Sequence, residues 1–176
     1  NDANAAALGE VLAGAAKGAS NAVAVTLGTG VGGGIVIDGK LFTGFHYGGA
    51  ELGHMGIVRG GRKCTCGRRG CLEAYASATG LIRSTKEAMD AAPDSLMWEL
   101  AAENGGNVSG RTAFLAADRG DTAAQSVVNA YIEQLGYGLA SIINILAPEI
   151  LVIGGGVSNE GENLLRPLVE CVRPQL

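Results

Sequence analysis

Residues 22–42 read AVAVTLGTGVGGGIVIDGKLF, and the order of residue types in this stretch decides the fold. The apolar, β-branched run from Ala22 to Leu27 predicts a strand, and Ile35 to Ile37 predicts a second one. Asp38 and Gly39 then form a hairpin turn signal before a third short run, Lys40 to Phe42. The glycine-rich segment between the first two strands looks like a tight backbone turn. We therefore expect a β-sheet built around this hairpin.

Helical patterns surround the hairpin, and one more strand follows them. The pattern predicts helices over residues 3–17, 74–91, 95–104, 110–117, 121–146 and 161–171, and a buried strand over 149–153 that begins after Pro148. In the first helix, one face carries the apolar residues Leu8, Val11, Leu12 and Ala15. Residues 43–70 are dense in glycine and polar residues, which indicates a long loop. Strands and helices in this order predict one α/β domain with a loop insertion.

Composition and charge exclude several classes of protein. The chain has 176 residues, 47% of them hydrophobic, with a formal net charge of −4 and a mean hydropathy of +0.23. That is enough apolar material for one packed domain, and the acidity argues against nucleic acid as a partner. The sequence has no apolar stretch of about 18 residues and no signal-like start, so we expect a soluble, cytoplasmic protein. Because it opens at Asn1 without a methionine, we expect it to be part of a longer protein.

The long loop carries a set of residues with the spacing of metal ligands. Three thiols and one imidazole fill a tetrahedron around a soft cation and leave no open position for water, so this set predicts a structural zinc site. The predicted ligands are His54, Cys64, Cys66 and Cys71. Free thiols or a disulfide are the alternatives, and three clustered cysteines in a cytoplasmic protein argue against both. His46 is a less well placed fourth ligand, and Cys171 reads as a small core residue on a helix.

Two glycine-rich segments follow strands. Gly28, Gly30 and Gly33 match the letters of a dinucleotide fingerprint, but a strand follows where that fingerprint needs a helix. Such a turn can direct successive N–H groups toward a phosphate, with help from the Thr29 hydroxyl, or it can be an ordinary hairpin. A second turn, Gly154-Gly155-Gly156, follows the strand over 149–153. The pair suggests a nucleotide held between two glycine turns.

Three carboxylates are candidates for a polar site. Asp2 begins a helix, where it would either cap that helix or act as a general base that the helix dipole keeps ionised. Glu51 and Glu73 flank the predicted metal ligands. Loop glutamates are usually solvated, but the metal would fix the positions of these two, which makes them candidates for binding hydroxyl groups.

Together these motifs resemble the ROK (repressor, open reading frame, kinase) family, and within it the bacterial glucokinases. The segments that carry the resemblance are NDANA (1–5), GTGVGGG (28–34), ELGH (51–54), CTCGRRGCLE (64–73), ASATG (76–80) and GGGV (154–157). The resemblance implies an actin-like, ribonuclease-H-like ATPase domain with a zinc-bearing loop at about 44–73. Residues 1–176 would be the C-terminal large domain of a two-domain sugar kinase, without its N-terminal domain and final helix.

The resemblance also implies an activity, namely transfer of phosphate from MgATP to the 6-hydroxyl of a hexose, with glucose favoured. Alternatives within the family are an N-acetylhexosamine or fructose kinase and a sugar-responsive repressor, and a stand-alone zinc module is a third reading. Because the family's N-terminal phosphate motif is absent, we expect this fragment to be inactive alone. A homodimer or homotetramer would be the assembly.

Roles for individual residues follow from the same motifs. Asp2 would be the base that deprotonates the sugar hydroxyl. The sugar would be hydrogen-bonded by Asn1, Asp2, Glu51, His54 and Glu73. The ATP phosphates would lie against Gly28, Thr29 and Gly30, and the adenosine against Gly154, Gly155 and Gly156.

Overall fold

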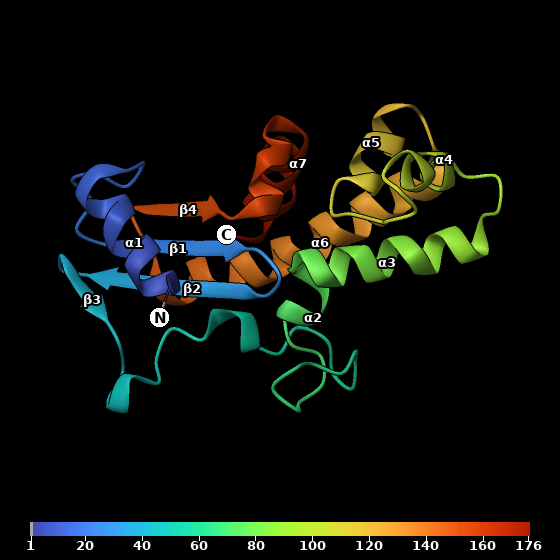
Figure 1. The fold of residues 1–176 in the computed structure, drawn as a ribbon. Coiled ribbons are helices and arrows are strands. Elements are labelled where there is room, and N and C mark those ends of the chain that lie inside the picture. Colours follow the sequence, from blue (N-terminus) through green and yellow to red (C-terminus); the bar gives the residue numbers. More distant parts are fainter. Residues whose placement is uncertain (1) are drawn as a thin grey trace.

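Residues 22–42 form three strands of a four-stranded mixed sheet in the computed structural model, which describes residues 2–176 (Figure 1). Three antiparallel strands follow one another, β1 (Ala22–Leu27), β2 (Val31–Ile37) and β3 (Lys40–Phe42). The fourth, β4 (Ile150–Gly154), pairs with β1 in parallel, so the order across the sheet is β3-β2-β1-β4. The predicted α/β class is therefore confirmed, and the structure adds that the sheet is mixed.

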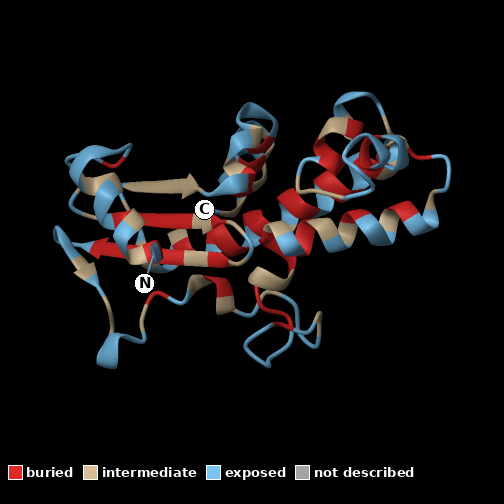
Figure 2. Ribbon diagram, in the orientation of Figure 1, coloured by how far each residue is buried: buried red, intermediate tan, exposed pale blue. Residues whose placement is uncertain are grey.

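The two faces of β1 are packed differently. Ala22 and Ala24 belong to a small core that also contains Ala7 of the first helix. Val23, Val25 and Leu27 point the other way into the large core, which is shared with the remaining helices. This alternation follows the two-residue period of a strand, with small side chains where a helix lies close and large ones in the main core. Figure 2 shows β1 and β2 as the most completely buried strands.

Helix α1 (Asp2–Ala13) lies across the sheet through its smallest residues (Figure 1). Ala3 and Ala7 are its buried side chains. Of the predicted apolar face, Leu8 is 40% and Leu12 66% exposed, and Val11 is partly buried against the small core. The reason that the two alanines are buried lies in β2, where Gly34 has no side chain and lets the helix backbone approach closely. Its neighbours Gly32 and Gly33 are strand residues too, and not part of a turn as predicted.

The same helix ends four residues before its predicted end at Lys17. The Glu10 carboxylate accepts a hydrogen bond of 2.7 Å from the Ala15 N–H, which replaces the next helical hydrogen bond. A glycine at position 14 follows the last helical residue, as is common at helix ends. The helix therefore stops at Ala13.

The other helices agree with the predicted ranges to within a few residues. They are α2 (Glu73–Ala76), α3 (Ala78–Ala91), α4 (Leu96–Glu103), α5 (Thr112–Asp118), α6 (Thr122–Leu146) and α7 (Glu162–Val172). Short 3-10 turns add η1 (Phe45–Tyr47), η2 (Leu52–His54), η3 (Gly156–Glu160) and η4 (Arg173–Gln175). Within residues 2–176, no helix is long and apolar enough to cross a membrane.

One predicted helix is two helices, because the chain turns at Ser77. This residue is extended (φ −77°, ψ 163°), and its hydroxyl accepts the Gly80 N–H at 3.0 Å as the N-cap of α3. The prediction of one helix over 74–91 is therefore wrong at its start, because Glu73–Ala76 form the separate helix α2.

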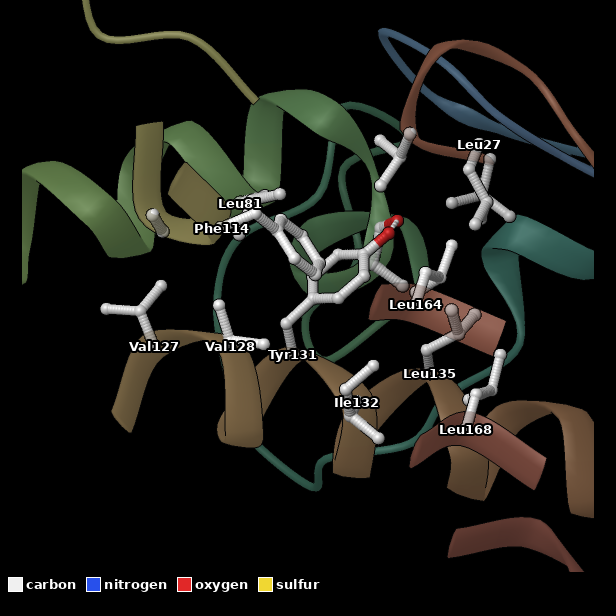
Figure 3. Packing of buried hydrophobic residues seen from close by; sticks show 14 of the residues in the cluster. Leu27, Leu81, Phe114, Val127, Val128, Tyr131, Ile132, Leu135, Leu164 and Leu168 are labelled. Atoms are coloured by element: carbon white, nitrogen blue, oxygen red, sulfur yellow. Dashed lines mark hydrogen bonds between the residues drawn. The ribbon is translucent and has the colours of Figure 1, made fainter. Parts of the chain in front are cut away.

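The long helix α6 passes behind the sheet and joins it to the other helices (Figure 1). In the main core its Tyr131 ring packs edge-to-face on Phe114, with 6.3 Å between ring centroids (Figure 3). Burial raises the pKa of Tyr131, and its hydroxyl donates a 2.8 Å hydrogen bond to the Ala76 carbonyl. This bond fixes the end of α2 against α6.

The close approach of α1 to β2 gives a test. A Cβ at Gly34 would lie 2.5 Å from the Ala7 Cβ and 2.6 Å from the Ala3 carbonyl oxygen. Because backbone must move, we expect Gly34→Ala to lower the free energy of unfolding by about 1–3 kcal/mol, measured by urea denaturation.

The matched control is Gly9→Ala on α1, where an added Cβ meets nothing within 4 Å. We expect it to be neutral or to stabilise by up to about 1 kcal/mol, since alanine favours the helix. Equal stabilities of the two variants would contradict this packing.

Candidate functional site

Four residues that suit a metal ion lie together in the segment between β3 and α2, residues 43–72, which we call the metal-ligand loop. The ligand atoms of His54, Cys64, Cys66 and Cys71 all lie within 4.8 Å of one another. The Cys66 and Cys71 sulfurs are 3.6 Å apart, and the Cys64 sulfur is 3.7 Å from His54 Nδ1. A tetrahedral ion with metal–sulfur distances of about 2.3 Å requires separations of about 3.6–3.8 Å. The donor set therefore fits a four-coordinate metal, and the cysteines are free thiols rather than a disulfide.

Tight turns bring the sulfurs together. The Cys64 carbonyl accepts the Gly67 N–H at 3.0 Å, and the Cys64 N–H donates to the Arg68 carbonyl at 2.9 Å. Gly67 and Gly70 have φ of +86° and +79°, a conformation that favours glycine. At Gly70 a Cβ would also collide with the Val58 backbone. The glycines between the cysteines are therefore part of the ligand geometry.

The thiols differ in acidity. Hydrogen bonds from the Arg68 backbone and side chain lower the pKa of Cys66 to about 6. Burial raises the pKa of Cys71 to about 12, and the neighbouring sulfurs add to this effect. A bound divalent cation would supply the charge that allows all three sulfurs to be thiolates.

The two remaining candidates from the sequence have different outcomes. His46 is exposed on η1, where its ring stacks edge-on against Phe45, and it is not part of the metal-ligand cluster. The structure therefore favours His54 over His46 as the fourth ligand. Cys171 is partly buried and packs against the main core, as predicted.

Glu73 joins the metal-ligand loop to the glycine turn of the hairpin. One carboxylate oxygen accepts the Thr65 hydroxyl at 2.7 Å, and the other accepts the Val31 N–H at 3.1 Å. Burial alone would raise the pKa of Glu73, but these hydrogen bonds and the nearby His54 outweigh it, so the pKa lies below its usual range. A Cβ at Gly30 would lie 2.5 Å from the same carboxylate. The turn and the loop are therefore in direct contact.

Two other predicted sugar ligands, Asp2 and Glu51, are each next in sequence to residues that pack on β2. Glu51 is exposed, and its carbonyl accepts the His54 N–H at 3.0 Å, which fixes the 3-10 turn between them. Asp2 is the exposed first residue of α1, next to Ala3, which packs on Gly32 of β2. Asn1 lies outside the described residues. The roles of these side chains stay predictions.

The two glycine turns lie side by side at one edge of the sheet. Because β1 and β4 are parallel neighbours, both turns leave the sheet at the carboxyl ends of their strands. A Cβ at Gly155 would lie 2.6 Å from the Leu27 carbonyl oxygen. Around Gly28, Gly154 and Gly156, an added Cβ would meet nothing within 4 Å. This open space beside exposed backbone is where a ligand could lie close to the chain.

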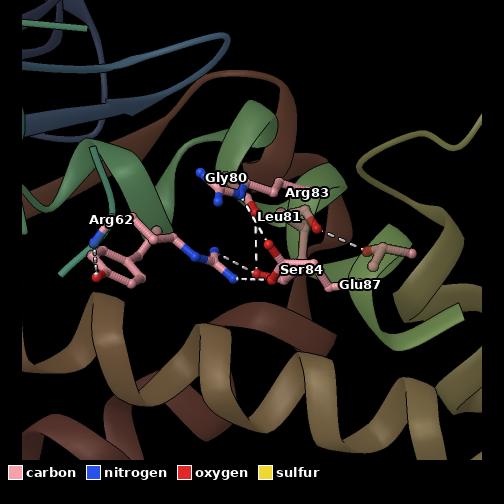
Figure 4. A network of polar contacts seen from close by, with 8 residues as sticks. Arg62, Gly80, Leu81, Arg83, Ser84 and Glu87 are labelled. Atoms are coloured by element: carbon pink, nitrogen blue, oxygen red, sulfur yellow. Dashed lines mark hydrogen bonds and ion pairs between the residues drawn. The ribbon is translucent and has the colours of Figure 1, made fainter. Parts of the chain in front are cut away.

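Arg62 attaches the metal-ligand loop to α3, a contact that the sequence motifs did not indicate (Figure 4). Its guanidinium donates to the Ser84 hydroxyl at 2.8 Å and pairs with Glu87. It also lies over the Tyr75 ring, 5.2 Å from the centroid, while the Tyr75 hydroxyl accepts the Arg62 N–H at 2.7 Å. No pattern in the sequence pairs residues 22 and 25 positions apart, so this contact depends on the fold.

This α/β fold, with its Cys/His cluster against a glycine turn, belongs to a known class. Residues 1–176 match the ROK family model over their whole length, and the chain belongs to the ROK family.

Relatives in this family include enzymes and regulators. The chain is 45% identical to the glucokinase of Halalkalibacterium halodurans over 96% of its own length and 51% of the relative's. It is 33% identical to a xylose repressor of Caldicellulosiruptor bescii, over 98% of the chain and 43% of that protein. Its fold matches a ROK family glucokinase from Streptomyces griseus in complex with glucose and AMPPNP, with TM-score 0.90 and 39% identity over all of this chain and 57% of that one. The chain thus spans about half the length of the curated relatives it matches.

The attachment of the loop by Arg62 gives a second test. Arg62→Met keeps the length of the side chain but removes its bonds to Ser84 and Glu87. We expect a loss of about 1–2 kcal/mol of stability, and faster amide hydrogen exchange over residues 55–72.

Arg83→Met is the control, because Arg83 also pairs with Glu87 but is 55% exposed. Its effect should be within about 0.5 kcal/mol. Unchanged exchange in the loop of the Arg62 variant would mean that other contacts hold the loop.

Proposed function

We propose that the protein is an ATP-dependent hexose 6-phosphotransferase, with glucose as the favoured substrate, built on an actin-like, ribonuclease-H-like domain. The observation that carries this proposal is the Glu73 bridge, in which one carboxylate is hydrogen-bonded both to Thr65 beside the Cys/His cluster and to Val31 beside the glycine turn. The Streptomyces griseus relative binds glucose and AMPPNP, which supports the same pair of ligands here.

In this proposal the hexose lies between the start of α1 and the metal-ligand loop. Zinc is the metal that suits a Cys3His set, and its chemistry there is to hold the loop in shape. His54 faces the sulfurs through Nδ1, which leaves Nε2 free to hydrogen-bond a sugar hydroxyl. Glu73 has further acceptor capacity, because two carboxylate oxygens offer about four lone-pair sites. Asn1 and Glu51 complete the set of sugar ligands.

Asp2 is the proposed general base. It is exposed at the N-terminus of α1, where the helix dipole stabilises the carboxylate form. From there it accepts the proton of the 6-hydroxyl as the oxygen attacks the γ-phosphorus of ATP, and ADP leaves. Phosphoryl transfer depends mostly on positioning and on charge stabilisation, so a base, Mg²⁺ and a closed cleft are sufficient.

The nucleotide would lie along the two adjacent glycine turns. Gly28, Thr29 and Gly30 would face the phosphates, and Gly154, Gly155 and Gly156 the adenosine. The parallel pairing of β1 and β4 supports this arrangement, because it brings both turns to one edge of the sheet. Ligands bind at such edges in many α/β proteins.

The domain arrangement is part of the proposal. Residues 1–176 would form the C-terminal large domain, with the zinc loop at about 44–73, and a further N-terminal domain would close over the cleft. Clustered thiols that bind zinc fit a reducing cytoplasm.

A sugar-responsive repressor is the second candidate, favoured by the similarity to the xylose repressor. Both functions would use the sugar-binding residues. Only the kinase needs a base at Asp2, so this residue separates the two.

The kinase proposal predicts the effect of one substitution. In the complete protein that contains this chain, Asp2→Asn should lower kcat about 10²- to 10⁴-fold, because the base is lost. The dissociation constant for glucose should change by less than about threefold, because the amide keeps a hydrogen-bond acceptor and the bond is weakened by only about 0.5 kcal/mol. A coupled ADP-release assay and calorimetry measure the two quantities, and Glu10→Gln is the control on the same helix.

The assay should include glucose, mannose, fructose and N-acetylglucosamine, to define the substrate. Normal turnover by the Asp2→Asn variant would remove Asp2 from the mechanism. Failure of the unmodified protein to phosphorylate any of these sugars, with sugar binding retained, would favour the repressor.

A further inference from the structure

The carbonyl groups of the glycine turn are held by the start of α3. The Ala78 N–H donates to the Gly28 carbonyl at 2.8 Å, and the Thr79 hydroxyl donates to the Thr29 carbonyl, also at 2.8 Å. These bonds join residues 50 positions apart in the sequence. Both carbonyls therefore point toward the helix and away from the space on the other side of the turn.

Of the N–H groups in the turn, some form hydrogen bonds within the protein and others do not. The Gly28 N–H donates to the Gly30 carbonyl at 3.0 Å, and the Val31 N–H donates to Glu73. Among residues 2–176, the structure gives no hydrogen-bond partner to the N–H groups of Thr29 and Gly30. Two successive free N–H groups with their neighbouring carbonyls turned away form the kind of concave donor pair that binds an anion.

The helix that holds the turn is itself fixed. Ser77 is buried and caps α3 by accepting the Gly80 N–H. Arg62 donates to Ser84, one helical turn after Gly80 on the same helix. A hollow of about 230 Å³ lies alongside, lined in part by Thr29, Thr79 and Glu73. Among the described residues, Thr79 is the α3 side chain that hydrogen-bonds to the turn, beside the backbone bond of Ala78.

We propose that Thr79 is a positioning residue for phosphate binding. Its hydroxyl holds the Thr29 carbonyl so that the N–H groups of Thr29 and Gly30 face the phosphates of the nucleotide. The residue does not touch the substrate, and it acts by keeping the turn in the orientation that binds the anion. This inference rests on the proposed kinase function and adds to it a residue that the motifs did not assign.

The test is Thr79→Val, which keeps the shape of the side chain and removes the hydroxyl, in the complete protein that contains this chain. Loss of one hydrogen bond to an exposed turn should raise the KM for ATP and the dissociation constant of ADP about three- to tenfold. Affinity for adenosine, which has no phosphate, and the KM for glucose should stay within about twofold of the unmodified values. Thr79→Ser should restore nucleotide binding, because it restores the donor.

Ser126→Ala is the control, since it removes a hydroxyl that donates to a backbone carbonyl at 3.0 Å on the distant α6. Unchanged ADP affinity in Thr79→Val would overturn the inference, as would equal weakening of ADP and adenosine. If the unmodified protein phosphorylates no hexose, the kinase proposal fails, whereas the contrast between ADP and adenosine still decides the role of Thr79.

Discussion

The Glu73 carboxylate makes the contact on which the candidate site depends. It accepts hydrogen bonds from the metal-ligand loop, through Thr65 and the Cys64 thiol, and one from the first residue of β2, Val31. Its two oxygens therefore fix a long loop, which has little regular structure of its own, against the edge of a rigid sheet. In our account the sugar ligands and the phosphate turn keep their relative positions because this one side chain contacts both. In the same account, a bound metal would have the complementary task of keeping Thr65 and His54 close to Glu73.

A second constraint is the absence of side chains on part of β2. Because Gly34 has no Cβ, α1 lies directly against the strand through Ala3 and Ala7. Asp2 is thereby held at a fixed place near the start of β2, where Val31 meets Glu73. The glycines in this strand thus contribute to the position of the proposed base, although they touch no ligand.

The sequence predicted much of the fold, because strands and helices have local periods. The hairpin, β4 and the long α6 were found in this way, and spacing and donor chemistry selected four residues whose ligand atoms lie together in the structure. The buried face of α1 was not, because the choice of Ala3 and Ala7 over Leu8 and Leu12 depends on the glycines opposite. The break at Ser77 and the contacts of Arg62 and Thr79 depend equally on partners far away in the sequence. No local pattern carries that information.

In our account, a metal-shaped loop holds His54 and Glu73 in position for a hexose. The most direct measurement is calorimetric titration of glucose into the complete protein that contains this chain, in its zinc-loaded, chelator-stripped and reloaded forms. Metal content is determined in each form, and circular dichroism shows that the fold is retained. We expect stripping to weaken glucose binding about tenfold or more, since at least two hydrogen bonds lose their geometry, and reloading to restore it. Equal glucose affinity in a folded, metal-free protein would contradict the account.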